Sequence, residues 1–448
     1  MSHYKPYPAY KDSGVEWLGR VPEHWEQVPL KRLVRSIEQG WSPECESWPA
    51  TGDEWGVLKV GCVNGGSFRP EENKALPASL EPRPELAVCK GDVLVSRANT
   101  RELVGSCVSA PQNYPNLLLC DKIYRIRAGE RVTPEFLAAL ISVHGRRAVE
   151  IEATGASSSM LNISQSVILD LPVALPEPAE QDQIMAAATR ETARIDALVA
   201  KKTRFIELLR EKRQALITHA VTKGLDPNVK MKDSGVEWLG EVPEHWAVKP
   251  FKVCIDFQEG PGIMAADFCD EGIPLLRVAG VQNRWASLEG CNYLSPDKVE
   301  RQWRHFRLEQ GDLLISASAS MGTVCEVAAE TVGAVAYTGL IRLREKNSVM
   351  LKEYIRSLVV SDLFSTQIDF FKAGSTIQHF GPTHLSQMFV VCPPLDEQGA
   401  IARHIESETQ RIDELVTKTE RSSELLKERR SALITAAVTG QIDLREEV

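Results

Sequence analysis

The strongest constraint on the fold of this chain is an internal duplication. Residues 11–19 recur without a change at residues 232–240, a shift of 232 − 11 = 221, and the block Val-Pro-Glu-His-Trp that follows recurs as well. A second pair of related blocks lies further along each half, at residues 194–198 and 411–415. Between these blocks the halves differ almost everywhere. Because this period far exceeds that of a solenoid repeat, the duplication predicts two domain-sized halves related by pseudo-symmetry.

The composition is that of a globular protein, with 43% hydrophobic and 25% charged residues among 448, so each half can bury its own core. The net charge of −9 argues against a protein that coats nucleic acid nonspecifically, but it is compatible with local basic faces. Ten cysteines without a Cys-x-x-Cys pair favour reduced thiols. Since no apolar run reaches the roughly 18–20 residues of a membrane span and no signal-peptide core is present, we expect a cytoplasmic protein that does not contact a membrane.

The region after each Trp-containing block predicts a mixed domain of strands and helices. Short branched and aliphatic runs bounded by Gly and Asp predict the strands. Thr133 and Pro134 predict the start of a helix over the apolar residues that follow, and residues 351–360 predict its counterpart. Strands are expected at residues 57–60, 92–96 and 123–127 in the first region, and at residues 274–278, 312–316 and 340–344 in the second. Because the order of elements matches, we expect the two regions to share one fold.

A long helix is predicted after each of these regions, at residues 180–221 and 397–438, with Gly224 and Gly440 as stop signals. Spacings of three and four residues predict one stripe on each helix, and neither stripe is fully apolar, so we expect the two helices to pack on each other. At about 40 residues each, they would be roughly 60 Å long. The predicted stripes are Ile195, Leu198, Lys202, Phe205, Leu209, Lys212 and Leu216 in the first helix, and Ile412, Leu415, Thr419, Ser422, Leu426, Arg429 and Leu433 in the second. The predicted fold class is α+β, with two similar mixed α/β domains separated by two long antiparallel helices in a pseudo-twofold repeat.

Taken together, the repeated blocks resemble the specificity subunit of type I restriction–modification systems over essentially the whole chain. The residues that carry the resemblance are Lys-Asp-Ser-Gly-Val-Glu-Trp-Leu-Gly, Val-Pro-Glu-His-Trp, a Glu-Gln pair after proline, and Arg-Ile-Asp-x-Leu, each present in both halves. The resemblance implies five segments: a conserved anchor at 1–25, a target-recognition domain at 26–176, a central conserved region at 177–246, a second target-recognition domain at 247–394, and a C-terminal conserved region at 395–448.

The resemblance also implies a function in phage defence. Each target-recognition domain would read one half of a bipartite site in double-stranded DNA, and the conserved regions would dock two modification (methyltransferase) subunits in a complex that also contains restriction/translocase subunits. It implies a noncatalytic chain that binds no cofactor, with S-adenosylmethionine, ATP and Mg²⁺ on the partner subunits. The residues agree, because the chain has no Gly-Lys dipeptide for a phosphate-binding loop, no Asn-Pro of an amino-methyltransferase signature, and no Cys/His set with zinc spacing.

Three polar clusters at corresponding places in the two halves are the candidate DNA contacts. Bases are read by Arg or Lys at guanine, Asn or Gln at adenine, and Ser or Thr at either, from exposed loops on a rigid scaffold. The candidates of the first half are Asn64 and Arg69, then Arg97, Asn99, Thr100 and Arg101, then Ser157, Ser158, Ser159 and Asn162. Those of the second half are Gln282, Asn283 and Arg284, then Ser318 and Ser320, then Ser375, Thr376, Gln378 and His379. Since serine is too short to span a groove as arginine does, we expect unlike half-sites.

Two other functions are compatible with the sequence. The acidic balance favours a coiled-coil scaffold whose variable domains bind protein rather than DNA. An enzyme with an unrecognised site is the third reading. Selection from a randomised duplex pool separates them, because a scaffold selects no sequence and an enzyme turns over a substrate without partners.

Overall fold

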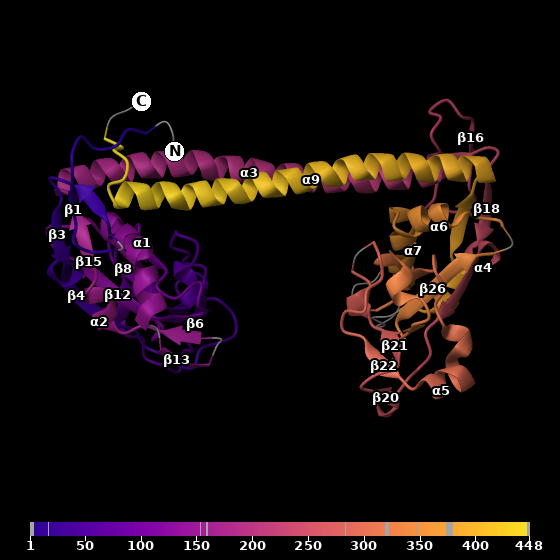
Figure 1. Ribbon diagram of the computed structural model, residues 1–448, viewed down its shortest axis with the longest axis horizontal. Helices are drawn as coiled ribbons and strands as arrows, with labels where there is room; N and C mark the ends of the chain where they lie inside the picture. Colours follow the sequence, from indigo (N-terminus) through magenta and orange to yellow (C-terminus); the bar gives the residue numbers. More distant parts are fainter. Residues whose placement is uncertain are drawn as a thin grey trace. The chain divides into compact units, whose positions relative to one another are not determined.

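A computed structural model of the chain describes residues 4–16, 18–152, 154–157, 160–282, 284–318, 322–346, 348–372 and 380–445. The chain forms two compact units, unit 1 from Met1–Lys201 with Ser422–Val448, and unit 2 from Lys202–Arg421. Each unit contains one variable region and a part of each of two long helices, α3 (Pro178–Lys223) and α9 (Leu395–Val438) (Figure 1). The duplication of the sequence thus corresponds to two units of structure.

Unit 1 is built on two four-stranded sheets. The first has the strand order β10-β8-β12-β4 with antiparallel pairings, and the second has the order β6-β5-β11-β7 with β5 and β11 parallel. Their strands are β4 (Val34–Gln39), β5 (Gly56–Leu58), β6 (Asn73–Ala75), β7 (Ala87–Val88), β8 (Val93–Ser96), β10 (Cys107–Ser109), β11 (Tyr114–Leu118) and β12 (Ile123–Ala128). Smaller sheets pair β1 (Tyr10–Asp12) with β2 (Arg20–Pro22), β3 (Glu26–Pro29) with β15 (Pro172–Leu175), and β14 (Met160–Asn162) with both β13 (Thr154–Ser157) and β9 (Ala98–Asn99). The helices of this region are α1 (Pro134–Glu152) and α2 (Gln165–Leu169).

Strand β8 lies in the middle of this core. Val93 and Val95 pack in the apolar cluster that includes α1, whereas Leu94 packs in the cluster that includes β5 and β11. Because successive side chains of a strand point to opposite faces, both faces of β8 are buried, which explains its uninterrupted apolar run. Helix α1 begins where the sequence predicts it, since the Thr133 hydroxyl accepts a hydrogen bond from the Phe136 amide at 3.4 Å.

Unit 2 repeats the first of these sheets strand for strand. Its order β24-β23-β26-β19 matches β10-β8-β12-β4, and a second sheet has the order β20-β22-β21-β25 with β21 and β25 parallel. The strands are β19 (Ile255–Glu259), β20 (Phe268–Cys269), β21 (Ile273–Leu276), β22 (Asn292–Leu294), β23 (Leu313–Ser316), β24 (Val324–Glu326), β25 (Val335–Ala336) and β26 (Leu340–Glu345). Two-stranded sheets pair β16 (Met231–Asp233) with β17 (Glu241–Pro243) and β18 (Ala247–Pro250) with β27 (Phe389–Cys392). The helices are α4 (Phe251–Cys254), α5 (Pro296–Lys298), α6 (Lys352–Val359), α7 (Asp362–Lys372) and α8 (Pro382–Gln387).

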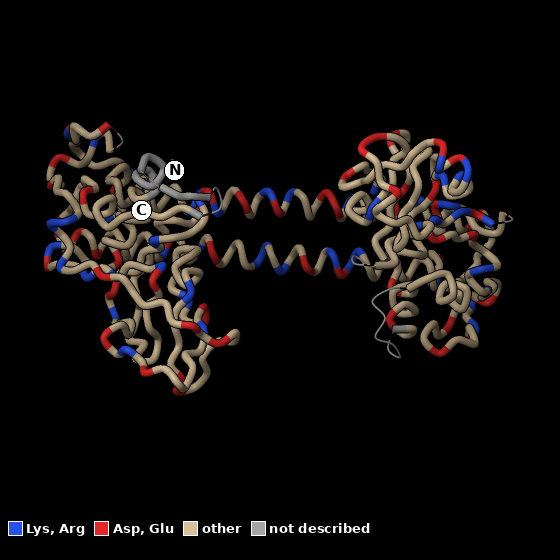
Figure 2. The backbone as a smooth tube through the Cα atoms, turned by 90° about the horizontal axis from the view of Figure 1, so that it is seen from below, with Lys and Arg blue, Asp and Glu red and all other residues tan. Residues whose placement is uncertain are grey.

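The long helices carry equivalent ion pairs in the two units. In unit 2, Arg213 of α3 contacts Asp413 of α9 at 3.0 Å, and Arg210 contacts Glu420 at the same distance, so the two helix segments run antiparallel. In unit 1, Arg430 contacts Asp196 at 2.9 Å. This is the same pair after a shift of 430 − 213 = 217 and 413 − 196 = 217. Lys and Arg alternate with Asp and Glu along both helices (Figure 2).

Every second residue of the stripe predicted for α3 is exposed and does not face the interior. Leu198 and Phe205 are 48% and 45% exposed, whereas Ile206 is buried and Val199 packs against the core of unit 1. In α9, the buried position is Ser423 rather than Ser422. At each of these positions two adjacent residues have similar polarity, so the spacing of the sequence does not determine which one faces inward. Packing of the helix against the rest of its unit determines it.

A glutamate at the start of each long helix holds the Trp-containing anchor. The Trp25 indole donates to Glu180 at 3.2 Å, and Nε2 of His24 lies 2.9 Å from the same carboxylate. Unit 2 repeats this contact, with the Trp246 indole donating to Glu397 at 2.9 Å and His245 beside it. Trp25 and Trp246 are buried and anchor this segment by packing, whereas Trp17 lies outside the described residues.

The glutamine that follows each glutamate bonds the long helix to the loop that precedes an earlier helix of the same unit, α1 in unit 1 and α6 in unit 2. Gln181 is fully buried; its Oε1 accepts from the Thr133 amide at 2.8 Å, and its Nε2 donates to the carbonyls of Arg131 and Pro176 at 2.9 and 2.8 Å. Gln398 makes the same three bonds, to the Leu351 amide and to the carbonyls of Val349 and Pro393. The Glu-Gln pair of the sequence is therefore a structural joint in both units.

In unit 1 the segment after α9 is packed on the N-terminal segment. The Asp443 amide donates to the Lys5 carbonyl at 2.8 Å. The Arg445 guanidinium lies 4.8 Å from the Tyr7 ring centre and 3.6 Å from Glu180. Hydrogen bonds from Arg445 hold the pKa of the Asp443 carboxyl below its ordinary value. The contacts of Arg445 thus hold the N-terminal segment against the segment that follows α9, although no peptide bond joins the two segments directly.

The predicted α+β class and internal repeat are confirmed. The predicted strands are observed at or within two residues of their expected positions, and the long helices extend only a few residues beyond theirs. Among the described residues, no helix is long and apolar enough to cross a membrane.

Candidate nucleic-acid interface

The second polar cluster of unit 1 begins where β8 ends, and only part of it is exposed. Arg97 is half-buried; its Nε donates to the Tyr124 hydroxyl at 3.1 Å and its Nη1 to the Asp121 carbonyl at 3.3 Å. Asn99 is buried, whereas Thr100 and Arg101 are exposed. In this structure Arg97 and Asn99 are engaged inside the unit, and Thr100 and Arg101 are the members of the cluster that face solvent.

The third cluster joins the second through a small sheet. Strand β14 pairs with β9, with Leu161 opposite Asn99 and Asn162 opposite Ala98. The Ile163 amide also donates to the Arg97 carbonyl at 3.0 Å. Asn162 is exposed beside the second cluster. The backbone of Ser157 belongs to β13, while Ser158 and Ser159 lie outside the described residues.

The first cluster reaches the same place through one side chain. Asn99 Nδ2 donates to Asn64 Oδ1 at 3.3 Å, so clusters that are 35 residues apart in sequence are in contact. Asn64 is half-exposed and precedes Gly65 and Gly66, which both have positive φ. Arg69 of this cluster instead points inward, where its Nη2 donates to the Gly61 carbonyl at 2.6 Å. The structure therefore brings the three predicted clusters of unit 1 together.

Buried charge stiffens the strands beneath these clusters. Arg125 of β12 is almost fully buried, with its guanidinium 2.9 Å from Glu38 and 3.5 Å from Asp92. Hydrogen bonding from Arg125 lowers the pKa of the Glu38 carboxyl. In unit 2, Arg344 contacts Asp312 as Arg127 contacts Asp92 in unit 1, with Nη2 2.7 Å from the carboxylate, whereas the buried Arg342 donates to the carbonyls of His305 and Arg307. A paired buried guanidinium fixes the strand ends from which the polar loops extend.

Three of the candidates of unit 2 lie within the described residues. Gln282 is exposed, and its Nε2 donates to the Val278 carbonyl at 2.9 Å. Arg284 lies 2.8 Å from Glu406 of α9 and stacks on Trp285. Ser318 is half-buried beside Ser316, whose hydroxyl donates to the Ser318 carbonyl at 2.6 Å. The Phe380 amide donates to the Ala317 carbonyl, so the end of the third segment adjoins the second cluster. Outside the described residues lie Asn283, Ser320, Ser375, Thr376, Gln378 and His379.

Sequence reasoning missed a basic and aromatic segment of unit 2. Arg301, Arg304 and His305 are exposed just after α5, in a π-helical turn and the 3₁₀ turn that follows. Arg304 lies 3.2 Å from Glu300, and Arg301 donates to the Asp297 carbonyl, so part of this charge is compensated locally. The signal was the interleaving of basic and aromatic residues over residues 298–307, a pattern that nucleic-acid-binding surfaces use.

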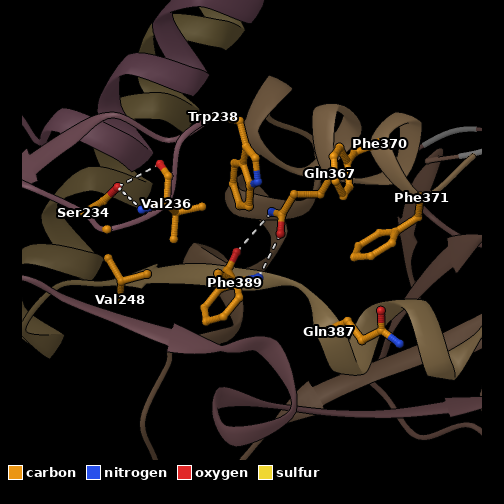
Figure 3. A pocket seen from close by; sticks show the side chains of 10 residues that line it. Ser234, Val236, Trp238, Val248, Gln367, Phe370, Phe371, Gln387 and Phe389 are labelled. Carbon is orange, nitrogen blue, oxygen red and sulfur yellow. Dashed lines mark hydrogen bonds between the residues drawn. The ribbon is translucent and has the colours of Figure 1, made fainter. Parts of the chain in front are cut away.

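Unit 2 contains a cavity of about 460 Å³ (Figure 3). Aromatic side chains dominate its wall, among them Trp238, Phe370 and Phe389, and Gln367 is bonded to the backbone of Phe389 at 2.8 and 3.1 Å. Its lining residues carry no titratable side chain. Within the described ranges, no group of three or more His, Cys, Asp or Glu side chains is arranged to hold a metal ion.

Comparison with known proteins gives a consistent answer. No protein-family model matches the chain. The chain is 32% identical over 188 residues to the type I restriction enzyme EcoEI specificity subunit of Escherichia coli, and the match covers 41% of this chain and 31% of that protein. It is 22% identical over 447 residues to a protein of Methanocaldococcus jannaschii provisionally named the type I restriction enzyme MjaX specificity subunit, with 96% of each chain covered. The chain is a relative of the type I restriction enzyme specificity subunits.

Solved structures agree on the fold. A chain from a study of complex assembly and conformational transition of the type I R-M system superposes with a TM-score of 0.68 at 17% identity, covering 93% of this chain and 98% of its own. The HsdS subunit from Thermoanaerobacter tengcongensis gives a TM-score of 0.52 at 16% identity over 96% of this chain and all of its own. The resemblance inferred from the repeated blocks is confirmed, since the relatives are named specificity subunits of type I restriction enzymes. The chain spans only about a third of the EcoEI subunit that it matches.

Proposed function

We propose that this chain is the DNA-binding specificity subunit of a type I restriction–modification complex and that it reads a bipartite site in double-stranded DNA, one half-site per unit. The observation that carries this proposal is the convergence of three polar clusters in unit 1, around Asn64, Arg101 and Asn162, on a frame that is duplicated in unit 2. Exposed donors and acceptors on rigid strand ends are what base reading requires. The unlike residues at equivalent places make the two half-sites different.

Two modification subunits would dock on the long helices. Leu198 and Leu415 are 48% and 46% exposed, and they are equivalent after a shift of 217 residues. Leu208 and Leu425 are equivalent by the same shift and also exposed. Each unit thus presents one of these four leucines from each long helix, and large apolar side chains kept exposed at repeat-related positions favour two equivalent protein partners.

The chemistry would belong to the partners. S-adenosylmethionine would be held by the modification subunits, and ATP and Mg²⁺ by the other partner subunits, while this chain supplies the DNA sequence that is recognised. No residue of this chain is assigned a step in methyl transfer or DNA cleavage.

Selection from a randomised duplex pool by the full-length chain, alone and with the modification subunits, tests this proposal. We expect enrichment of one bipartite sequence with two unlike half-sites and an unread spacer. A protein-binding scaffold would enrich no sequence. Turnover of a substrate by the chain without partners would instead indicate an enzyme.

A further inference from the structure

The buried carboxamide of Asn99 has only one chemically consistent orientation. One of its terminal atoms lies 2.9 Å from the Thr100 amide, which is a donor, so that atom must be the oxygen. Nδ2 of Asn99 therefore faces the other way, where it lies 3.3 Å from Ser96 Oγ and 3.3 Å from Asn64. Its two N–H groups serve these two acceptors. The side chain is 7% exposed, and its residue pairs with Leu161 of β14, so the orientation is held by the strand.

This orientation determines how Asn64 is turned. Because Asn99 donates, the atom of Asn64 that faces it must accept, which makes it Oδ1. Nδ2 of Asn64 then points away from Asn99, and within the described part of the chain it donates to no other group. A solvent-facing N–H pair on a half-exposed side chain is a donor presented to a ligand.

The neighbouring backbone leaves room for a ligand. Gly65 and Gly66 follow with φ of 86° and 80°, where a side chain would be strained. A Cβ built at Gly65 would meet no atom within 4 Å, whereas one built at Gly66 would lie 3.6 Å from Nη1 of Arg430. The loop after Asn64 is therefore open at Gly65 and bordered by helix α9 at Gly66.

We propose that Asn64 is a specificity-determining residue of the first half-site that acts as a hydrogen-bond donor, and that Asn99 is the positioning residue that sets this polarity. The inference rests on the proposed DNA-reading function. A donor in the major groove pairs with the acceptor atoms there, which are N7 and O6 of guanine, O4 of thymine and N7 of adenine, and not with the amino groups of adenine and cytosine. It assigns Asn64 to donation alone, and not to the bidentate reading of adenine that the sequence suggests for asparagine.

Unit 2 is turned the other way at the equivalent position. Gln282 follows the turn of residues 278–281 as Asn64 follows residues 60–63, and its Nε2 is bonded to the Val278 carbonyl. Within the described residues its oxygen accepts no hydrogen bond from the chain, so this end of the carboxamide is the one left for a ligand. The equivalent carboxamides thus offer a donor in unit 1 and an acceptor in unit 2. The second half-site therefore serves as an internal control for substitutions made in unit 1.

The test exchanges one atom at each position in the full-length chain and measures base preference by selection from a randomised duplex pool. In Asn99→Asp, the carboxylate still accepts from the Thr100 amide but cannot donate, so Asn64 must turn its amide over and present its oxygen. Asn64→Asp presents an oxygen directly. Both variants should move the preference at one position of the first half-site from a base that is read through an acceptor atom toward the amino group of adenine or cytosine, by about 5- to 150-fold. The second half-site should be unchanged.

Asn64→Ala should abolish discrimination at that position, and adding Asn99→Asp to it should change nothing further. The inference is overturned if Asn99→Asp only weakens binding to all sequences alike, because that is a structural effect, or if wild type selects a sequence whose preferences all survive Asn64→Ala. In that last case the proposed function stands and the assignment of Asn64 fails. If wild type selects no sequence at all, the proposed function and this inference fail together.

Discussion

Removing the side-chain amide of Gln181 should lower the stability of unit 1 and leave the stability of unit 2 unchanged. In Gln181→Leu the volume is nearly kept, but the Thr133 amide and the carbonyls of Arg131 and Pro176 lose their partners. Arg131 is exposed, so its carbonyl can bind water instead. Two groups are then left unsatisfied in or near the core, at about 1–3 kcal/mol each, which predicts a loss of about 2–6 kcal/mol in the stability of unit 1. That is a large part of the stability of an ordinary domain.

Native-state hydrogen exchange resolved by peptide measures this loss directly. At about 1.4 kcal/mol per factor of ten, amides of α1 that exchange through opening of unit 1 should exchange about 30-fold faster or more in the variant. Gln398→Leu should do the same to α6 in unit 2. Gln183→Leu is the matched control, because Gln183 lies two residues away on the same helix and is exposed. The reasoning is refuted if α1 in Gln181→Leu exchanges within about threefold of the control, or if either variant affects both units equally.

Three further outcomes are expected. Leu198→Glu, at an exposed position, should keep the fold but reduce the bound modification subunits from two to one in native mass spectrometry; two copies bound at wild-type affinity would argue against docking there. Because a depressed carboxyl pKa adds stability above the unfolded value of about 4 and this stability is lost as the pH falls through the folded value, the melting temperature of unit 1 should fall on acidification below about pH 4, and less so in Asp443→Asn; equal acid sensitivity would contradict the Arg445 contact. Exposed Cys89 and Cys269 should react with maleimide well before Cys107, since burial raises the pKa of the Cys107 thiol; equal rates by mass spectrometry would be inconsistent with this core.

The elements could be predicted because their signals are local. Thr133 with Pro134 marks a helix start, and the run around Val93 marks a strand buried on both faces. The facing of α3 could not be predicted, since Leu198 and Val199 are adjacent and equally apolar, and packing against the rest of unit 1 decides between them. Spacing alone does not carry that information.

The sequence predicted which loops form the candidate site, but not how their side chains are oriented or which of them are in contact. Asn99 follows a strand and is polar, which suggested exposure, yet its burial depends on pairing with β14, more than 60 residues later. The bond between Asn99 and Asn64 and the ion pair between Arg284 and Glu406 likewise join residues far apart in sequence. Such contacts are set by the fold, which explains why polar residue type alone did not separate outward-facing from inward-facing side chains.

Because of the contacts around Tyr7 and Arg445, two identical peptides are attached to the long helices in different ways. Residues 11–19 and 232–240 have the same sequence, but the second copy is part of a continuous loop that leaves α3, whereas the first has no peptide link to α9 and is held there by noncovalent contacts. The first copy therefore stays beside the segment that follows α9 only while these contacts persist, whereas the second stays joined to α3 by the chain itself. Because the intrinsic exchange chemistry of the two identical peptides is the same, any difference between their amide exchange rates reports their attachment and surroundings.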